Sequence, residues 1–243
     1  MRYLLTFSYD GTLFYGYQKQ KNKRTVQEEI EKVLSKINNE FTAISASGRT
    51  DAHVHAINQK AHFDSSKEYN LDRLKHSMNK MLPNDIFIKN IERVNDTFHA
   101  RFDVIKKEYV YKINIGEYDP FSREYIYQYN WNLNVEKMRE AINYLKGTHN
   151  FKSVTKTIKE EKDYVRTIYD AKINVKDDII IISFVGSGFM RYMVRNMVGL
   201  LIAVGEEKIK PIDIVDILNK EDRIFAKKTA PAEGLYLTNV YYE

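Results

Sequence analysis

The stretch Gly48-Arg49-Thr50-Asp51-Ala52-His53-Val54-His55-Ala56 places a carboxylate between two segments, residues 41–47 and 58–64, that have the composition of strands. Burying a carboxylate without a partner is costly, so Asp51 belongs either to a surface turn or to a working site. The residues alone leave both open. Asp51 can shape a turn before a strand, or serve as nucleophile, general base or metal ligand.

Outward from this segment, the first half of the chain has the element order β-α-β-β-α-β. Strands are predicted over residues 2–9, 41–47, 58–64 and 86–94, and helices over 26–37 and 71–81. The spacing of Thr25 and Glu28 is typical of a capping box, Asn70 can cap the second helix, and Pro83 stops that helix. The order is that of a ferredoxin-like unit.

The second half repeats this order. Strands are predicted over residues 107–115, 165–175, 179–185 and 235–241, and helices over 134–145, 189–204 and 211–219. We therefore expect an α+β fold of two similar halves that meet near residues 103–106, with domains over residues 1–104 and 105–243. No low-complexity linker separates the halves, so we expect them to pack rigidly and to form a groove suited to a ligand.

Composition narrows the class of protein. The 243 residues are 43% hydrophobic and contain no cysteine, so a sizeable core is expected and disulfides and thiolate metal sites are excluded. No apolar run reaches the ~18 residues of a membrane span, and the N-terminus enters a strand pattern at once, so we expect a soluble cytoplasmic protein. The net charge of +5 with 13% aromatic residues suits nucleic acid, but it also fits an ordinary basic protein.

Four further features allow two interpretations each. The loop over residues 9–18 offers either stacking faces or a turn closed by packed rings. The glycines at 186 and 188 precede a predicted helix and could bind an anion, although the full nucleotide-binding pattern is missing. Arg191 and Arg195 are one helical turn apart in an apolar segment and need a carboxylate or a phosphate, for which Asp51 is a candidate. The lysine-rich residues 152–162 form either a solvated loop or an RNA contact.

A metal site is a separate hypothesis. His53 and His55 are two residues apart and would share a face if they lay on a strand. A third ligand would then have to come from His62, His99, His149 or a carboxylate. No zinc-binding spacing in the sequence supports this, so we expect hydrogen-bonded or solvent-facing histidines instead.

The ordered motifs resemble those of the TruA family of tRNA pseudouridine synthases, nearly from end to end of the chain. The stretch over residues 48–56 looks like the catalytic motif of that family. Tyr9-Asp10-Gly11-Thr12-x-Phe14-x-Gly16 with Thr25-Val26-Gln27 resembles its N-terminal signature. Later blocks are Phe98-His99-Ala100-Arg101-Phe102, Tyr109-x-Tyr111, Gly147-x-His149-x-Phe151, Gly188-Phe189-Met190, Met193-Val194-Arg195-Asn196-Met197-Val198-Gly199 and Thr229-Ala230-Pro231-Ala232-x-Gly234-Leu235.

The resemblance implies the pseudouridine synthase fold, in which two ferredoxin-like halves have antiparallel sheets that flank a central RNA-binding cleft. It implies isomerisation of uridine to pseudouridine at positions 38, 39 and 40 of the tRNA anticodon stem-loop, by a homodimer without cofactor or metal. By position, Asp51 corresponds to the catalytic aspartate and Arg49 to the arginine that helps to flip the target nucleotide. Tyr109 corresponds to the tyrosine that stacks on the uracil, and Arg195 to the arginine paired with the aspartate.

Two residues depart from the family pattern. His53 stands where glycine is usual, and it would be strained if that position needs a positive φ. Tyr17 stands where tryptophan is usual. The histidine leaves the set of target positions open, and the sequence does not decide whether the carboxylate attacks C1′ or removes the C2′ proton. The alternative from another class is an RNA-binding protein without catalysis, built from the same two sheets.

Overall fold

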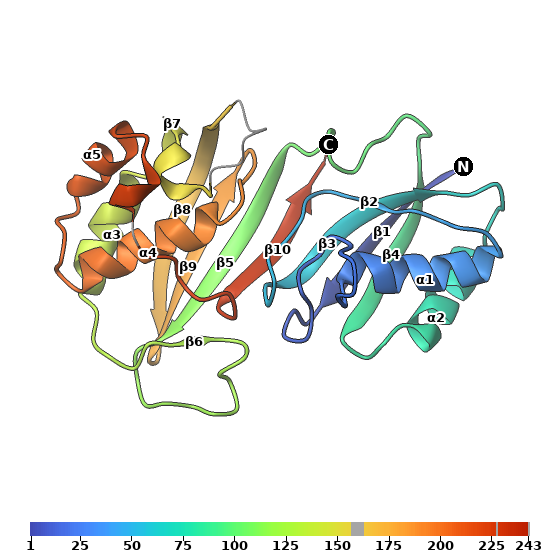
Figure 1. Ribbon diagram of the computed structural model, residues 1–243, viewed down its shortest axis with the longest axis horizontal. Helices are drawn as coiled ribbons and strands as arrows, with labels where there is room; N and C mark the ends of the chain where they lie inside the picture. Colours follow the sequence, from blue (N-terminus) through green and yellow to red (C-terminus); the bar gives the residue numbers. More distant parts are fainter. Residues whose placement is uncertain (157–162, 227, 243) are drawn as a thin grey trace. The chain divides into compact units, whose positions relative to one another are not determined.

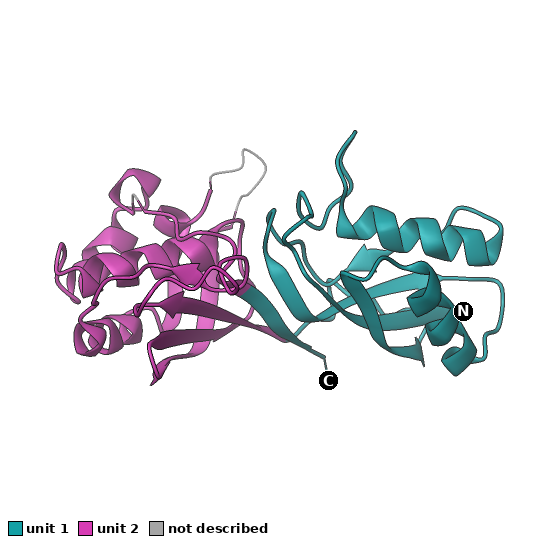
Figure 2. Cartoon of the chain, turned by 90° about the horizontal axis from the view of Figure 1, so that it is seen from below, with its two compact units in different colours: residues 1–105, 236–243 teal, residues 106–235 magenta. Residues whose placement is uncertain are grey.

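The computed structural model describes residues 1–156, 163–226 and 228–242. The chain divides into two compact units, coloured separately in Figure 2. Unit 1 comprises residues 1–105 together with residues 236–243, and unit 2 comprises residues 106–235. Each unit contains a mostly antiparallel sheet with helices, so the predicted α+β class is confirmed.

Unit 1 contains the predicted order β-α-β-β-α-β and gains one strand from the end of the chain (Figure 1). Its elements are β1 (Arg2–Tyr9), α1 (Val26–Asn38), β2 (Ser45–Ala46), β3 (His55–Asp64), α2 (Leu71–Met81), β4 (Ile86–Val94) and β10 (Leu235–Tyr241). The strand order is β4-β1-β3-β10, and the short β2 pairs with β3. β1 runs antiparallel to both neighbours, whereas β10 runs parallel to β3 through Tyr236 opposite His55.

The core of unit 1 follows from the residue pattern. Tyr3, Leu5, Phe7 and Tyr9 alternate along β1 and are all buried, whereas Thr6 and Ser8 between them are partly exposed. α1 buries the apolar side chains that recur at helical spacing, and the side chain of Asn70 accepts a hydrogen bond from the N–H of Arg73 at the start of α2.

Two predictions for unit 1 were wrong. The strand predicted over residues 41–47 is reduced to β2, because the N–H of Thr42 donates to the hydroxyl of Ser35 and the N–H of Ile44 donates to the carboxylate of Glu31. Side chains of α1 thereby take the donors that a longer strand would have used. Thr25 precedes α1 but its side chain makes no capping hydrogen bond, so the capping box does not form.

Unit 2 has the order β-β-α-β-β-β-α-α with two short 3-10 turns. Its elements are β5 (Lys106–Asn114), β6 (Tyr127–Gln128), α3 (Val135–Asn143), β7 (Gly147–Asn150), η1 (Lys152–Val154), β8 (Val165–Lys176), β9 (Ile179–Gly186), α4 (Met193–Gly205), α5 (Asp213–Asn219) and η2 (Arg223–Phe225). The strand order is β5-β9-β8-β7, antiparallel throughout, and β6 lies parallel to β5. α3 packs against α4 and β8 (Figure 1).

Both predicted starts of the late helices were too early. α4 begins at Met193 rather than 189, because Tyr192 has a φ of 64° in the left-handed region and cannot continue a right-handed helix. α5 begins at Asp213, two residues after Pro211. The predicted hairpin is confirmed as β8 and β9, with Asp177 at a positive φ in its turn.

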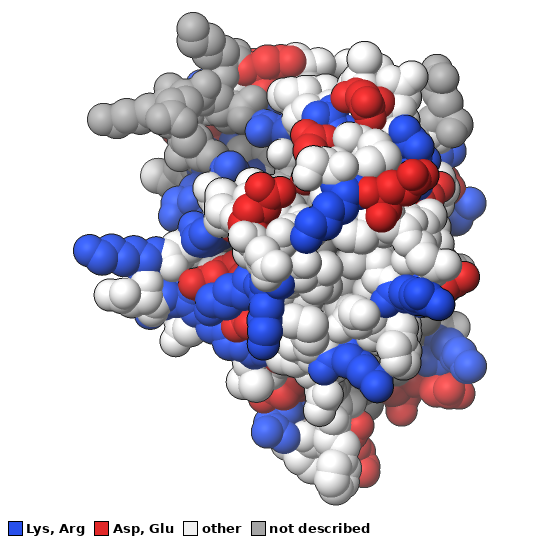
Figure 3. Space-filling view, turned by 90° about the vertical axis from the view of Figure 1, so that its right-hand side faces the viewer, with Lys and Arg blue, Asp and Glu red and all other residues white. Residues whose placement is uncertain are grey.

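Many charged side chains are paired within their own unit. Arg2 contacts Asp64 with its Nε at 2.8 Å, and Arg24 contacts Asp85 with its Nη1 at 2.6 Å. On the face drawn in Figure 3, basic and acidic side chains are interspersed with uncharged surface. Among the described residues on that face, charges of both signs are mixed. Within the described ranges, no helix combines the length and apolar character needed to cross a membrane.

Candidate functional site

Asp51 lies in the turn between β2 and β3 with its side chain partly exposed, and Arg49 is exposed two residues before it. Backbone hydrogen bonds fix this turn. The carbonyl of Thr50 accepts from the N–H of Tyr17 at 3.1 Å, and the carbonyl of Asp51 accepts from the N–H of Val54 at 3.3 Å. The carboxylate is thus presented by a backbone that is held from outside the turn as well as within it.

Side chains from the sheet hold the same turn from below. The hydroxyl of Tyr9 on β1 lies 2.8 Å from the hydroxyl of Thr50. Buried Gln59 on β3 accepts from the hydroxyl of Ser47 at 2.7 Å and donates to the carbonyl of Gly48 at 3.1 Å. Burial raises the pKa of Tyr9 to about 12, so its hydroxyl stays protonated and available for hydrogen bonding.

Two glycines of the N-terminal loop allow it to pack directly on the Asp51 turn. A Cβ added to Gly11 would lie 2.2 Å from the carbonyl oxygen of Val54. A Cβ added to Gly16, whose φ is +96°, would lie 3.0 Å from the carbonyl oxygen of Thr50 and 3.4 Å from the carbonyl carbon of Asp51. A Cβ at Gly11 would clash with the backbone, and the positive φ of Gly16 strains any other residue, so the N-terminal signature has a direct role in shaping the turn.

The two histidines of the motif contact the N-terminal loop in opposite ways. His55 is buried, and its Nδ1 accepts a hydrogen bond from the N–H of Gly11 at 3.0 Å and lies 3.2 Å from the carboxylate of Asp10. His53 is exposed, and its Nδ1 lies 2.8 Å from the carbonyl oxygen of Thr12, an acceptor that requires a protonated Nδ1. The N–H of His53 also donates to the carbonyl of Phe14. The two side chains therefore fasten the loop to either side of Val54.

These contacts remove the premise of the metal hypothesis. β3 begins at His55, and His53 precedes it in a turn with a φ of 64°, so the two do not share a strand face. The Nδ1 of His62 accepts from the N–H of Ala100, and the Nδ1 of His99 accepts from the N–H of Arg101. In the part of the chain that the structure describes, no group of three or more histidine, aspartate or glutamate side chains is arranged to hold a metal ion.

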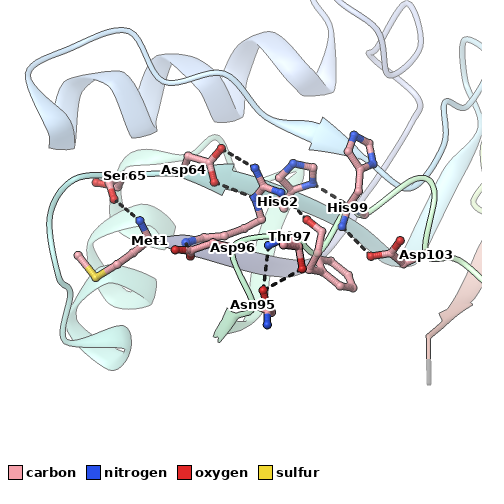
Figure 4. A network of polar contacts seen from close by, with 12 residues as sticks. Met1, His62, Asp64, Ser65, Asn95, Asp96, Thr97, His99 and Asp103 are labelled. Carbon is pink, nitrogen blue, oxygen red and sulfur yellow. Dashed lines mark hydrogen bonds and ion pairs between the residues drawn. The ribbon is translucent and has the colours of Figure 1, made fainter.

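Figure 4 shows the polar network around His62 and His99 in unit 1. The two rings meet edge to face with centroids 4.8 Å apart, and the N–H of His99 donates to the carboxylate of Asp103. Burial, together with the positive charge of Arg2, lowers the pKa of His62 to about 4. His62 is therefore neutral at physiological pH and acts as an acceptor that holds the 98–102 block.

Tyr17 is buried, and its hydroxyl makes no hydrogen bond among the described residues. Its ring lies 6.5 Å from that of Tyr9, and burial raises its pKa well above the ordinary value. The side chain therefore serves as packing beneath the N-terminal loop, the role that the larger indole of tryptophan could also fill. Of the two interpretations of the 9–18 loop, Tyr17 and buried Phe14 fit the packed turn.

In unit 2, Tyr109 lies on β5 opposite Phe184 of β9 and is only 8% exposed. Its ring meets that of Phe189 edge to face, with centroids 5.1 Å apart and an interplanar angle of 76°. Neighbouring Tyr111 is buried on the same face and donates to the carbonyl of Pro231. A ring held in this way on a central strand is a rigid surface.

Arg195 projects from the first turn of α4, and its guanidinium is oriented by a contact with a loop. Its Nε donates to the carbonyl of Ala230 at 2.7 Å, and the N–H of Ala230 donates back to the carbonyl of Arg195 at 3.0 Å. Next to it, buried Asn196 accepts from the hydroxyl of Thr229. The 229–231 segment is thereby joined to α4, and the plane of the Arg195 guanidinium is fixed by the backbone.

Three cations gather around the ring of Tyr192. The guanidinium carbons of Arg195 and Arg191 lie 5.0 Å and 5.4 Å from the ring centroid, and the Nζ of Lys156 lies 5.6 Å from it. Arg191 precedes α4 and so does not lie one helical turn below Arg195, but the shared ring still brings the two together. Of the lysine-rich stretch 152–162, residues 157–162 lie outside the described residues.

The four predicted site residues thus fall in two groups. Arg49 and Asp51 share one turn of unit 1, and Tyr109 and Arg195 belong to β5 and α4 of unit 2. The supporting residues Gly11, Gly16 and Gln59 were not predicted as part of the site. The two glycines were visible in the N-terminal signature, but no local pattern indicates that a strand glutamine would bond to a distant turn.

Comparisons with known proteins give a consistent result. A family profile described as tRNA pseudouridine synthase matches residues 5–103 and 141–243. A protein named tRNA pseudouridine synthase A from Exiguobacterium sp. is 48% identical over 242 residues, which span 100% of this chain and 98% of the relative. The Bacillus subtilis (strain 168) protein of the same name is 44% identical over 246 residues, with 100% of each chain covered. A Bacillus cereus protein named tRNA pseudouridine synthase A 1 is 46% identical, covering 98% of this chain and 97% of that one.

Proposed function

The chain belongs to the tRNA pseudouridine synthase family, and we propose that it isomerises uridine to pseudouridine at positions 38, 39 and 40 of the tRNA anticodon stem-loop, with Asp51 as the catalytic carboxylate. The catalytic role of Asp51 is supported by the hydrogen bonds and packing contacts that hold its turn in place. Contacts from β1, β3 and the N-terminal loop all converge on residues 47–55. A structural surface turn needs no such support, whereas a reacting group must be held in position.

The reaction itself explains which groups are required. The N1–C1′ bond breaks, the uracil turns, and C5 joins C1′, after which the hydrogen on C5 leaves as a proton and N1 regains one. The ionised carboxylate of Asp51 either attacks C1′ or takes the proton from C2′ to give a glycal. Atoms and electrons balance within the nucleoside, so the proposed reaction requires neither an oxidant nor a phosphoryl donor.

The target uridine must leave its base stack before the carboxylate can reach C1′, and a cation and an aromatic face can hold the base once it is out. We assign the role of the cation to exposed Arg49 and the role of the aromatic face to Tyr109, whose ring contacts that of Phe189. Arg195 would pair with Asp51 and keep it ionised, and its bond to Ala230 supports a fixed orientation.

This assignment divides the work between the halves of the chain. Residues 1–104 would carry the catalytic segment, and residues 105–243 would complete an RNA-binding cleft between two ferredoxin-like halves. The order β4-β1-β3 in unit 1 and the order β5-β9-β8 in unit 2 support a ferredoxin-like arrangement within each half. We further propose a homodimer that acts on tRNA in the cytoplasm.

The role of Asp51 is tested by the release of tritium from tRNA labelled at uridine C5, because this hydrogen leaves only when C5 is joined to C1′. We expect Asp51→Asn to abolish release while the thermal unfolding midpoint stays within a few degrees of wild type. Asp72→Asn is the matched control, since Asp72 is an exposed aspartate in the first turn of α2. Release by Asp51→Asn at the control rate would refute the catalytic role.

Arg195→Ala separates chemistry from binding. Because the proposed partner of Arg195 is the carboxylate rather than tRNA, the variant is expected to lose at least about 100-fold in the single-turnover rate, and less than about fivefold in tRNA affinity. The two quantities are measured by tritium release with excess enzyme and by filter binding. A loss of affinity that accounts for the whole loss of rate would contradict the pairing.

A further inference from the structure

The N-terminal loop exposes two side chains between buried neighbours. Leu13 is 68% exposed and Tyr15 is 49% exposed, whereas Phe14 and Tyr17 are almost fully buried. Gly16 faces the Asp51 turn. Leu13 and Tyr15 are also the two positions that the N-terminal signature leaves open. The defined positions of the signature therefore anchor the loop, and the open positions face solvent.

The backbone around Tyr15 is held in place. The N–H of Tyr15 donates to the carbonyl of Arg24 at 3.0 Å, and the side chain of Gln20 donates to the carbonyl of Tyr15 at 2.7 Å. Arg24 is fixed in turn by two contacts with Asp85, and its guanidinium lies 4.2 Å from the ring centre of Phe14. The exposed ring of Tyr15 thus stands on a rigid base, which lowers the entropic cost of binding a partner.

A cation accompanies the ring. The Nζ of Lys23 lies 4.1 Å from the ring centroid of Tyr15, and Lys21 and Lys23 are both exposed. Single-stranded nucleic acid is commonly bound by an aromatic face that stacks on a base, beside a lysine or arginine that meets its phosphate. An exposed Leu13 alone would mean little, because isolated apolar side chains are common on surfaces. The ring and the cation together are more specific.

The position of this ring relative to the Asp51 turn decides what it can contact. The carbonyl of Phe14 accepts from the N–H of His53, and Gly16 lies against Thr50 and Asp51. Tyr15 lies between these two residues, one step of about 3.8 Å from each. The backbone that carries Tyr15 is therefore packed against the Asp51 turn.

We propose that Tyr15 is a stacking platform for an unpaired tRNA nucleotide next to the target uridine, and that Lys23 meets the phosphate of that nucleotide. This rests on the proposed function and deepens it, because the contact would set which neighbouring nucleotide the enzyme prefers. Tyr15 is not required for packing, since Phe14 and Tyr17 fill the interior below the loop. Tyr15 is 49% exposed and Lys23 covers one face of its ring, so the proposed base stacks on the face opposite Lys23.

A double-mutant cycle between protein and RNA tests the contact. Single-turnover tritium release is measured for wild type, Tyr15→Ala and Tyr15→Phe, on a tRNA labelled at C5 of its uridines. It is repeated on tRNAs in which each unpaired nucleotide of the anticodon loop is replaced in turn by an abasic residue. Tyr118→Ala is the matched control, because Tyr118 is 59% exposed and follows the end of β5 that is remote from Tyr109 along the strand.

With intact tRNA, Tyr15→Ala is expected to lose roughly five- to 150-fold in rate at subsaturating enzyme, the range for one aromatic–base stack, whereas Tyr15→Phe and Tyr118→Ala retain the wild-type rate. With the tRNA that lacks the stacked base, the rate of wild type is expected to fall by a similar factor. The rate of Tyr15→Ala is expected to be the same on this tRNA as on intact tRNA. Two results would overturn the inference and leave the proposed function standing. One is equal rates for wild type and Tyr15→Ala on intact tRNA. The other is that, on every abasic tRNA, Tyr15→Ala still lowers the rate by the same factor as on intact tRNA. No release by wild type on any tRNA would overturn the proposed function, and the inference with it.

Discussion

His53 adopts a φ of 64°, so the residue that departs from the family glycine does sit in the left-handed region. A non-glycine residue there costs on the order of 1 kcal/mol. Its side chain compensates through the contact between Nδ1 and the carbonyl of Thr12, worth about 1 kcal/mol. The turn that carries Asp51 is therefore compatible with histidine at position 53.

The backbone strain at His53 and the hydrogen bond of its side chain nearly cancel, which gives a prediction. His53→Gly removes both the strain and the hydrogen bond, so the free energy of unfolding should change by less than about 1 kcal/mol and activity should stay within about threefold. His53→Val removes the hydrogen bond and places a β-branched residue in the left-handed region, so a loss of about 2 kcal/mol is expected. Urea denaturation and tritium release measure both. An inactive but stable His53→Gly would show that the imidazole itself serves the reaction.

At the scale of elements, the sequence predicted most helices and strands because their hydrophobic periodicity is strong. Failures occurred where a tertiary contact replaced the local pattern. Glu31 and Ser35 of α1 take the backbone donors of residues 42 and 44, which no property of residues 41–47 reveals. In the same way, Tyr192 lies in the left-handed region just before α4. The sequence does not predict this conformation, because the position is not a glycine.

Asp51 and Arg49 could be proposed as site residues because they belong to one motif, and Tyr109 and Arg195 because their blocks follow in family order. The contacts that hold the Asp51 turn could not be predicted, because they depend on the register between β1 and β3. Tyr9 pairs with Ala56 after an irregularity between Phe7 and Tyr9, a shift that follows from the packed strands rather than from the residue pattern.

The connection between β3 and the 98–102 block gives a prediction about pH. The N–H of Ala100 donates to the Nδ1 of His62, which must therefore be unprotonated, and the pKa of His62 is lowered to about 4. Between pH 6.5 and 4 the unfolded chain binds a proton at this site and the folded chain does not, so stability falls as the pH falls. The loss should approach about 1.4 kcal/mol per pH unit within that window, and about 3 kcal/mol in total.

Urea denaturation between pH 4.5 and 7.5 measures this loss, with His62→Gln as the comparison. The glutamine amide can still accept from Ala100 but does not titrate in this range. The free energy of unfolding of wild type should therefore decline more steeply than that of the variant as the pH falls below 6.5. Parallel curves for the two proteins would exclude His62 as the titrating group.

At the scale of the whole molecule, the family match extends over both units, and the proposed chemistry draws on both. Unit 1 supplies Asp51 and Arg49, and unit 2 supplies Tyr109 and Arg195. The proposal therefore requires the two units to act on the same nucleotide. The alternative, an RNA-binding protein without catalysis, would need a basic surface but no braced carboxylate.

The most direct test of this central claim is to map pseudouridine at each position of tRNA from cells that carry the gene, cells that lack it, and deleted cells supplied with wild type or Asp51→Asn. We expect pseudouridine at positions 38, 39 and 40 to disappear on deletion and to return with wild type only. Pseudouridine that persists at these positions after deletion, or that returns with Asp51→Asn, would contradict the claim.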